Sequence, residues 1–277
     1  MGPMHQQGEG GGALPGAVLT GLLLFVAAVC YLLAARRARC RNAVQGWSGW
    51  RSASFLTGLA LLAVALLPPL APAAHSDFRG HMAQHMLIGM YAPLALVLAA
   101  PITLLLRALP HDHARRVAVL LHSPPARLLA HPAAALTLST GTLGVLYFTP
   151  LYNAVMAHPA GHWLLHAHFL ASGCLFAYAI AGPDPAPSRP GVRSRLVYLG
   201  IAIAAHALIA QAMYGGFFLD VHAPIDQVQQ GAEIMYYGGD IAELLLAAAL
   251  VASWRPERRT STTSWRGRSG IGAPTPH

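Results

Sequence analysis

The chain is dominated by long apolar runs, each close to the length that crosses a lipid bilayer. A transmembrane helix needs about 20 consecutive, mostly apolar residues, and seven such runs occur in the 277 residues. They cover residues 14–35, 53–72, 81–106, 130–151, 162–181, 194–214 and 230–253. Only 10% of the residues are charged, against about 25% in a soluble domain. We therefore predict an all-α, polytopic membrane helix bundle of about seven transmembrane helices.

The arginines indicate how this bundle is oriented. All 18 basic residues are arginines, and only Arg79 falls outside the loops and tail that would share one side of the membrane. Basic loops stay in the cytoplasm, so we predict the N-terminus outside and the C-terminus in the cytoplasm. The expected location is the bacterial cytoplasmic membrane, as a multi-pass protein. Arginines placed between apolar spans reflect membrane orientation, so nucleic acid is not expected as a partner.

Three regions follow from this arrangement. Residues 1–13 are predicted to be a flexible extracytoplasmic N-terminus, and residues 14–253 the seven-helix membrane domain. Residues 254–277 are rich in Arg, Ser and Thr, and such a polar composition is typical of disorder. We expect this last region to be a disordered cytoplasmic tail.

Histidine and methionine gather at the predicted outer end of the third helix. His81 and His85 lie four residues apart, so both face the same side of the helix. Met82, Met86 and Met90 form a second stripe beside them. Imidazole suits copper, zinc and iron, and a thioether favours Cu(I). The alternative is a purely structural role, in which the histidines form hydrogen bonds between helices and the methionines fill gaps in the core.

Two further groups of metal-binding side chains are expected at the same membrane face. His158, His162 and His166 repeat the four-residue spacing where the fifth helix begins. Pro159 leaves open whether that helix reaches back to His158. The segment before the seventh helix adds His222 and Asp226. Three groups that converge at one depth predict a metal-handling site near the outer boundary of the membrane.

A polar layer is predicted deeper in the membrane. His206 lies near the middle of the sixth helix, and Asp240 and Glu243 near the middle of the seventh. Glu233 shares one helix face with both acids, and such groups in a membrane turn toward the bundle interior and find partners. We predict that this face meets the sixth helix and that His206 pairs with Asp240 or Glu243. A proton or ion relay, support for a metal site, and a structural clamp between helices all remain open.

Three segments of the chain resemble the CtaG-type assembly factors of caa-type cytochrome c oxidase: residues 81–109, 149–176 and 225–239. The resemblance implies a membrane assembly factor, not an enzyme, that helps to form the copper-B centre. The implied cargo is copper, expected as Cu(I), and the implied partners are the catalytic subunit of a haem–copper oxidase and the lipid bilayer. Residues carried over as metal-site candidates are His81, His85, His158, His162, Asp226 and Met235.

Two other functions are compatible with the residues. A haem-binding membrane electron carrier would use His85 and His166 as the two axial ligands. A proton-coupled transporter would use His206, Asp240 and Glu243. The sequence contains no GxSxG, HExxH, Walker or GxGxxG motif in a suitable setting, so hydrolases and transferases are not expected. The oligomeric state stays open.

Overall fold

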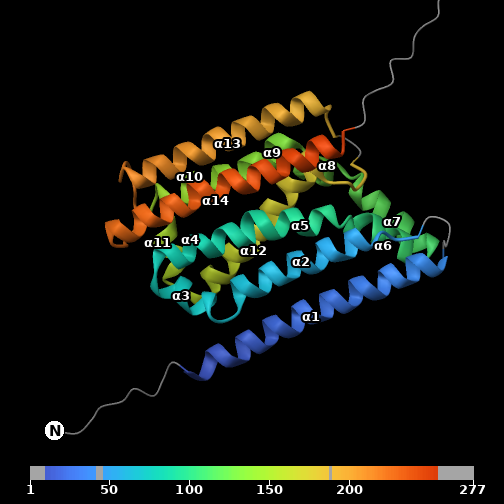
Figure 1. The fold of residues 1–277 in the computed structure, drawn as a ribbon, viewed down its shortest axis with the longest axis horizontal. Coiled ribbons are helices and arrows are strands. Elements are labelled where there is room, and N and C mark those ends of the chain that lie inside the picture. Colours follow the sequence, from blue (N-terminus) through green and yellow to red (C-terminus); the bar gives the residue numbers. More distant parts are fainter. Residues whose placement is uncertain (1–9, 42–45, 187–188, 255–277) are drawn as a thin grey trace, which may run out of the picture.

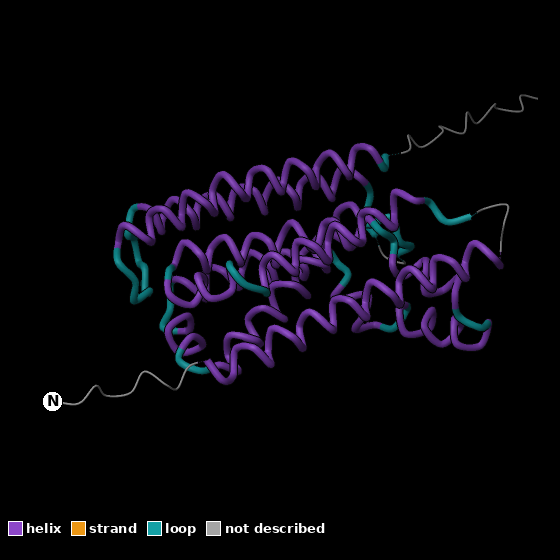
Figure 2. Tube along the Cα trace, turned by 60° about the horizontal axis from the view of Figure 1, so that its bottom comes forward, coloured by secondary structure: helices purple, strands orange, loops and turns teal. Residues whose placement is uncertain are grey.

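A computed structural model of the chain describes residues 10–41, 46–186 and 189–254, and within these residues it contains helices and no strands. The long helices run nearly parallel to one another along the long axis of the molecule (Figure 1). Most of the loops lie at its two ends (Figure 2). The prediction of an all-α bundle is therefore confirmed.

The helical elements follow one another with short connections. In chain order they are α1 (Gly10–Arg41), α2 (Gly49–Leu66), α3 (Leu70–Ser76), α4 (Phe78–Met86), the π-helical turn η1 (Leu87–Tyr91), α5 (Ala92–Leu98), α6 (Pro101–Ala108), α7 (His111–Leu121), α8 (Pro124–Leu129), α9 (Pro132–Leu136), the π-helical turn η2 (Thr137–Gly141), α10 (Thr142–Tyr147), α11 (Leu151–Met156), α12 (Pro159–Ala181), α13 (Val192–Tyr214) and α14 (Ile225–Ala252).

Six helices within the described residues are long and apolar enough to cross a membrane. They are Gly16–Arg41, Gly49–Leu66, Phe78–Leu98, Ala160–Ala181, Val192–Tyr214 and Ile225–Ala252. Each overlaps one of the predicted spans. The first helix is the most peripheral, and its large apolar side chains, such as Leu23 and Phe25, are mostly exposed. Such a surface suits contact with lipid, and the chain is a multi-pass membrane protein.

The predicted span 130–151 is not among these six helices. It forms a continuous stack of α9, η2 and α10 between Pro132 and Tyr147. At 1.5 Å per residue this stack is about 24 Å long, shorter than the roughly 30 Å hydrocarbon core of a bilayer. Pro132 begins the helix, and Phe148 leaves the helical conformation just before Pro150. The two prolines thus confine the helix to fewer residues than the apolar run contains.

The third predicted span, 81–106, is divided at Ala100. This residue has a left-handed backbone conformation (φ 54°, ψ 55°), and Pro101 starts the separate helix α6. The residue before a proline is disfavoured in the α region, which explains the break. Asp184, buried in the loop after α12, accepts hydrogen bonds from the backbone N–H groups of Ile102 (3.1 Å) and Thr103 (2.7 Å). A carboxylate from a distant loop therefore caps the N-terminus of α6.

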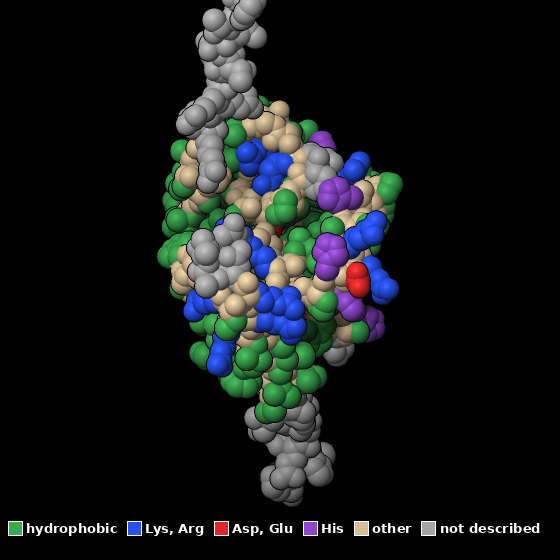
Figure 3. All heavy atoms as spheres, turned by 90° about the vertical axis from the view of Figure 1, so that its right-hand side faces the viewer, with side chains coloured by type: hydrophobic (Ala, Val, Ile, Leu, Met, Phe, Trp, Pro, Cys, Tyr) green, Lys and Arg blue, Asp and Glu red, His purple; other side chains and the backbone are tan. Residues whose placement is uncertain are grey.

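Arginines collect at one end of the bundle. Figure 3 looks onto the right-hand end of Figure 1 and shows their side chains (blue) around this face, with hydrophobic side chains on the flanks. Arg41 at the end of α1 donates to the carbonyl oxygens of Ala108 and Leu109, at 3.0 and 2.9 Å. At this end the arginines therefore also satisfy backbone carbonyls where helices finish.

Two of the three buried hydrophobic clusters among the described residues follow one another along the bundle. The first includes Met82, Ile88, Phe169 and Met235, and it surrounds the predicted histidine site. The second lies further along α5, α12, α13 and α14 and includes residues such as Leu94, Phe176, Leu199 and Leu246. The N-terminal segment predicted for residues 1–13 and the tail predicted for residues 254–277 lie almost wholly outside the described residues, except that α1 already begins at Gly10.

Candidate functional site

Helix α4 turns three polar side chains into the bundle. His81, Gln84 and His85 are exposed by only 2%, 1% and 5%. The helix begins after Asp77, whose side chain accepts a hydrogen bond from the N–H of Arg79 at 2.8 Å. Because residues three and four apart share a helix face, this start directs both imidazoles toward the interior. Burial of such polar groups is costly without partners, so their surroundings define what the site can do.

Helix α12 supplies the second pair of imidazoles. His162 and His166 are buried, and their ring centroids lie 4.4 Å apart. His158 is exposed and precedes the helix with an extended backbone, because α12 begins at Pro159. The question that the sequence left open is thus resolved: His158 does not extend the helical row of His162 and His166.

Gln84 connects the two helices. Its amide nitrogen donates to the carbonyl oxygen of Ala65 at 2.8 Å, and its amide oxygen lies 3.0 Å from Nε2 of His166. The amide oxygen can only accept a hydrogen bond, so His166 donates through Nε2. Hydrogen bonds of this kind fix the tautomer of metal-binding histidines. Gln84 was not among the residues predicted from the sequence, although a buried Gln between two histidines needs partners.

Aromatic side chains enclose His81. Its Nε2 lies 3.3 Å from the hydroxyl of the buried Tyr147, and its ring packs against Phe78 and Tyr152. Burial raises the pKa of Tyr152 to about 12, so this phenol stays neutral beside the imidazole. Neither tyrosine was predicted from the sequence as a contact of His81.

The predicted methionines lie in the same region, and three other candidates lie at its surface. Met82, Met86 and Met235 are buried in the hydrophobic cluster around the histidines. The exposed candidates are His158, His222 and Asp226. The backbone N–H of His222 donates to the side chain of Asn153 at 3.1 Å, which anchors this loop to α11.

The described residues contain no group of three His, Cys, Asp or Glu side chains close enough together to hold a metal ion. The arrangement instead offers pairs of imidazoles with thioethers nearby. Cu(I) accepts soft donors in low coordination numbers, whereas zinc sites normally need four ligands. Imidazole and thioether groups are donors of the kind that Cu(I) accepts.

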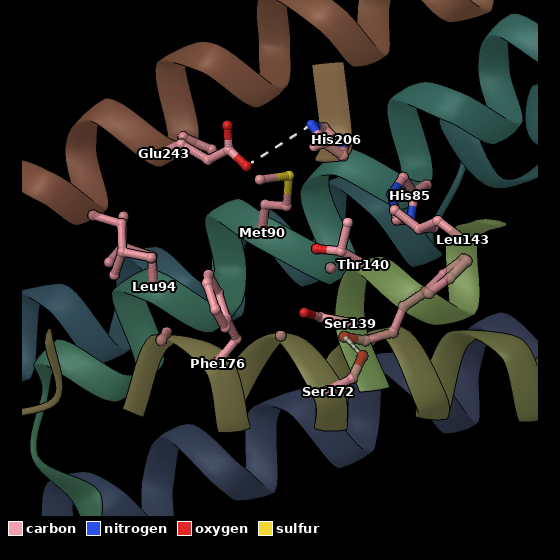
Figure 4. Close-up of a pocket in the computed structure, with 16 residues that line it drawn as sticks. His85, Met90, Leu94, Ser139, Thr140, Leu143, Ser172, Phe176, His206 and Glu243 are labelled. Atoms are coloured by element: carbon pink, nitrogen blue, oxygen red, sulfur yellow. Dashed lines mark hydrogen bonds and ion pairs between the residues drawn. The ribbon is translucent and has the colours of Figure 1, made fainter. Parts of the chain in front are cut away.

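A deeper polar pair joins α13 and α14. Nδ1 of His206 lies 4.0 Å from Oε1 of Glu243, and both side chains are buried (Figure 4). Asp240 is half-buried and Glu233 is exposed, so the predicted polar face of α14 is divided between the interior and the surface. Asp240 and Glu243 were both considered as partners of His206, and in the structure Glu243 is the one that lies beside it.

Gly239 makes room for His206. A methyl group at this position would overlap the Cε1 and Nδ1 atoms of the imidazole. Helix α14 runs from Ile225 to Ala252 without a break at this glycine. Glycine is therefore needed at position 239 so that His206 can pack closely against α14. It is not needed there to bend or end the helix.

We expect Gly239→Ala to lower the free energy of unfolding by about 1–3 kcal/mol, the usual cost of overpacking. Gly238→Ala is the matched control, because a methyl group there would lie 3.6 Å from Cε of Met86, an ordinary contact. Alanine is a better helix former than glycine by about 1 kcal/mol, so the control should be neutral or stabilised. Thermal unfolding in detergent, followed by circular dichroism, measures both. Equal stability of the two variants would contradict the packing assigned to His206.

Comparison with protein families matches residues 29–257 to the family described as "Cytochrome c oxidase caa3 assembly factor (Caa3_CtaG)". This stretch contains all the candidate residues described above. No solved structure matches the chain.

Curated relatives occur in mycobacteria. An uncharacterized protein of Mycobacterium leprae is 30% identical over 238 residues, which are 78% of this chain and 36% of that protein. Uncharacterized proteins of Mycobacterium bovis and Mycobacterium tuberculosis are each 31% identical over 249 residues, covering 83% of this chain and 38% of those proteins. The chain thus spans little more than a third of the length of these relatives. Because the family match extends over most of its length, the chain belongs to the cytochrome c oxidase caa3 assembly factor family.

Proposed function

We propose that this chain helps to assemble a caa3-type oxidase by holding Cu(I) among buried histidines and passing it to the copper-B centre of the catalytic subunit. The observation that carries this proposal is the burial of four imidazoles on two helices of one bundle: His81, His85, His162 and His166. Imidazoles in an apolar, thioether-containing cluster suit a soft monovalent ion. The family to which the chain belongs supplies the oxidase as the context.

Weak coordination supports transfer of the ion. A closed cage of four ligands holds a metal as part of the fold, and none of the described residues forms even a three-residue His, Cys, Asp or Glu cluster. An ion held by two imidazoles, with a methionine as a replaceable ligand, can leave by stepwise exchange of ligands. The catalytic subunit would supply the incoming histidines.

The proposed topology places this site on the outer side of the membrane. The chain enters with its N-terminus outside, crosses seven times with the short stack α9–η2–α10 as one crossing, and ends in the cytoplasm. The arginine-rich end of the bundle (Figure 3) would then face the cytoplasm. The exposed His158, His222 and Asp226 would lie at the outer rim, where they would meet incoming copper or the oxidase subunit.

The alternative of a haem-binding electron carrier has weaker support. His166 already hydrogen-bonds to Gln84, and His85 packs against Phe169 with ring centroids 4.3 Å apart. The absence of a Soret band in the purified protein would exclude haem. A proton-coupled transporter would rest on His206 and Glu243, and it would be recognised by substrate flux in liposomes that stops when Glu243 is neutralised.

A strain that lacks this chain is expected to make a caa3-type oxidase with normal haem but without copper-B. The ratio of copper to haem in the purified oxidase, together with its activity, measures this. The isolated chain, kept reduced and free of oxygen in detergent, is expected to bind at least one Cu(I). A normal copper-B content in the deletion strain would refute the proposed function.

A further inference from the structure

A small cavity begins at His85 and extends along the bundle away from His81. It has a volume of about 60 Å³ and is bordered by His85, Met90, His206 and Glu243. These side chains come from α4, η1, α13 and α14, and α12 closes the opposite side with Phe169 and other residues. The labelled side chains surround a common space, with the Met90 thioether beneath the gap between Glu243 and His206 (Figure 4).

Several polar atoms at this cavity have no hydrogen-bond partner among the described residues. They are both ring nitrogens of His85, Nε2 of His206 and Oε2 of Glu243, all of them buried. An unsatisfied buried polar group costs about 1–3 kcal/mol, and a bundle does not accumulate several at one place without compensation. The cavity is large enough for a small occupant, and an occupant that binds these atoms would remove the cost.

The chemistry of the donors identifies the occupant. Two imidazoles and a thioether form a soft donor set that favours Cu(I). One carboxylate accompanies them, so a monovalent cation leaves the cavity with no net charge, whereas a divalent cation leaves an uncompensated charge in the membrane interior. We propose that His85, Met90 and His206 form an inner Cu(I) site, in which Glu243 balances the charge and is not a ligand, since the described residues contain no group of three His, Cys, Asp or Glu side chains able to hold a metal ion.

The position of His85 connects this site to the outer histidines. His85 lies one helical turn after His81, about 6 Å further along α4. It also lines the cavity. A methyl group on Gly89 would lie 3.3 Å from Cε1 of His85, and one on Gly239 would overlap His206. The two glycines let both imidazoles pack closely at the cavity wall. This inference rests on the proposed function and adds to it a second holding position further into the membrane.

Competition between the purified chain and a chromogenic Cu(I) chelator, under reducing and oxygen-free conditions, tests the inner site. The wild-type chain is expected to bind about two Cu(I) ions, one outer and one inner. Met90→Leu and Glu243→Gln keep the volume of the side chain, so folding is preserved. Each substitution is expected to lower the affinity for one of the two Cu(I) ions about 10- to 100-fold. Met213→Leu is the matched control, because Met213 is buried on α13 but does not line the cavity.

The outcomes separate this inference from the proposed function. Selective loss of one Cu(I) in Met90→Leu and Glu243→Gln, with wild-type binding in Met213→Leu, supports the inner site. Met90→Leu and Glu243→Gln could instead bind Cu(I) as the wild type does, while the double variant His162→Asn with His166→Asn loses Cu(I) binding. In that case the inner site is refuted and the proposed function stands. If the wild-type chain binds no Cu(I), both are refuted.

Discussion

Cells in which His81 and His85 of this chain are both replaced by asparagine are expected to show oxidase activity close to that of a strain without the chain. Both imidazoles are buried on the inner face of α4, and His85 also lines the deeper cavity. The double substitution therefore removes donors from the outer histidines and from the inner cavity together. Changes around a metal site cost about 10- to 100-fold in affinity or activity, so we expect a loss at the upper end of this range.

Asparagine is chosen because it keeps a hydrogen-bonding group near Tyr147, whose hydroxyl contacts His81. The matched control is His111→Asn with His113→Asn, a pair on the exposed helix α7, which should leave oxidase activity unchanged. Rates of cytochrome c oxidation in isolated membranes measure activity, and immunoblots confirm equal amounts of the chain. Full activity of the double variant at wild-type abundance would show that these imidazoles do not carry copper.

The membrane-spanning helices were the most predictable feature of the fold, because the length of an apolar run is a local property of the sequence. The fifth and sixth predicted spans, 162–181 and 194–214, agree closely with Ala160–Ala181 and Val192–Tyr214. The span 130–151 was less predictable. Its helical stretch ends at Tyr147 and contains a π-helical turn, and both features depend on the surrounding bundle as well as on the apolar run.

The site was only partly predictable. Four-residue spacing correctly indicated that His162 and His166 lie on one helix face, and the pairing considered for His206 included Glu243. Gln84 gave no such signal, because its importance arises from the carbonyl oxygen of Ala65 and the imidazole of His166, which belong to other helices. Periodicity within one helix reveals which face is buried, but it does not reveal what that face will meet.

Close contact between α12 and η1 provides the most severe test of the fold itself. Gly173 on α12 lies against the backbone of Gly89, and a methyl group at Gly173 would overlap the carbonyl oxygen of Gly89 and lie 2.9 Å from Cγ of Pro93. Neither neighbour is the flexible end of a long side chain. Relief would require the two helical segments to separate, and η1 would then move the residues that border His85.

We therefore expect Gly173→Ala to reduce the free energy of unfolding by at least about 3 kcal/mol, the upper part of the range for overpacked sites, and to reduce the yield of folded protein. Gly200→Ala on α13 is the control, because no atom of the residues that the structure describes lies within 4 Å of a methyl group placed there. Helix propensity makes this control neutral or up to about 1 kcal/mol more stable. The same chemical change should thus have opposite effects at the two positions when unfolding is measured in detergent. Wild-type stability of Gly173→Ala would mean that α12 and η1 do not cross as closely as described, and the inner cavity beside them would then lose its structural basis.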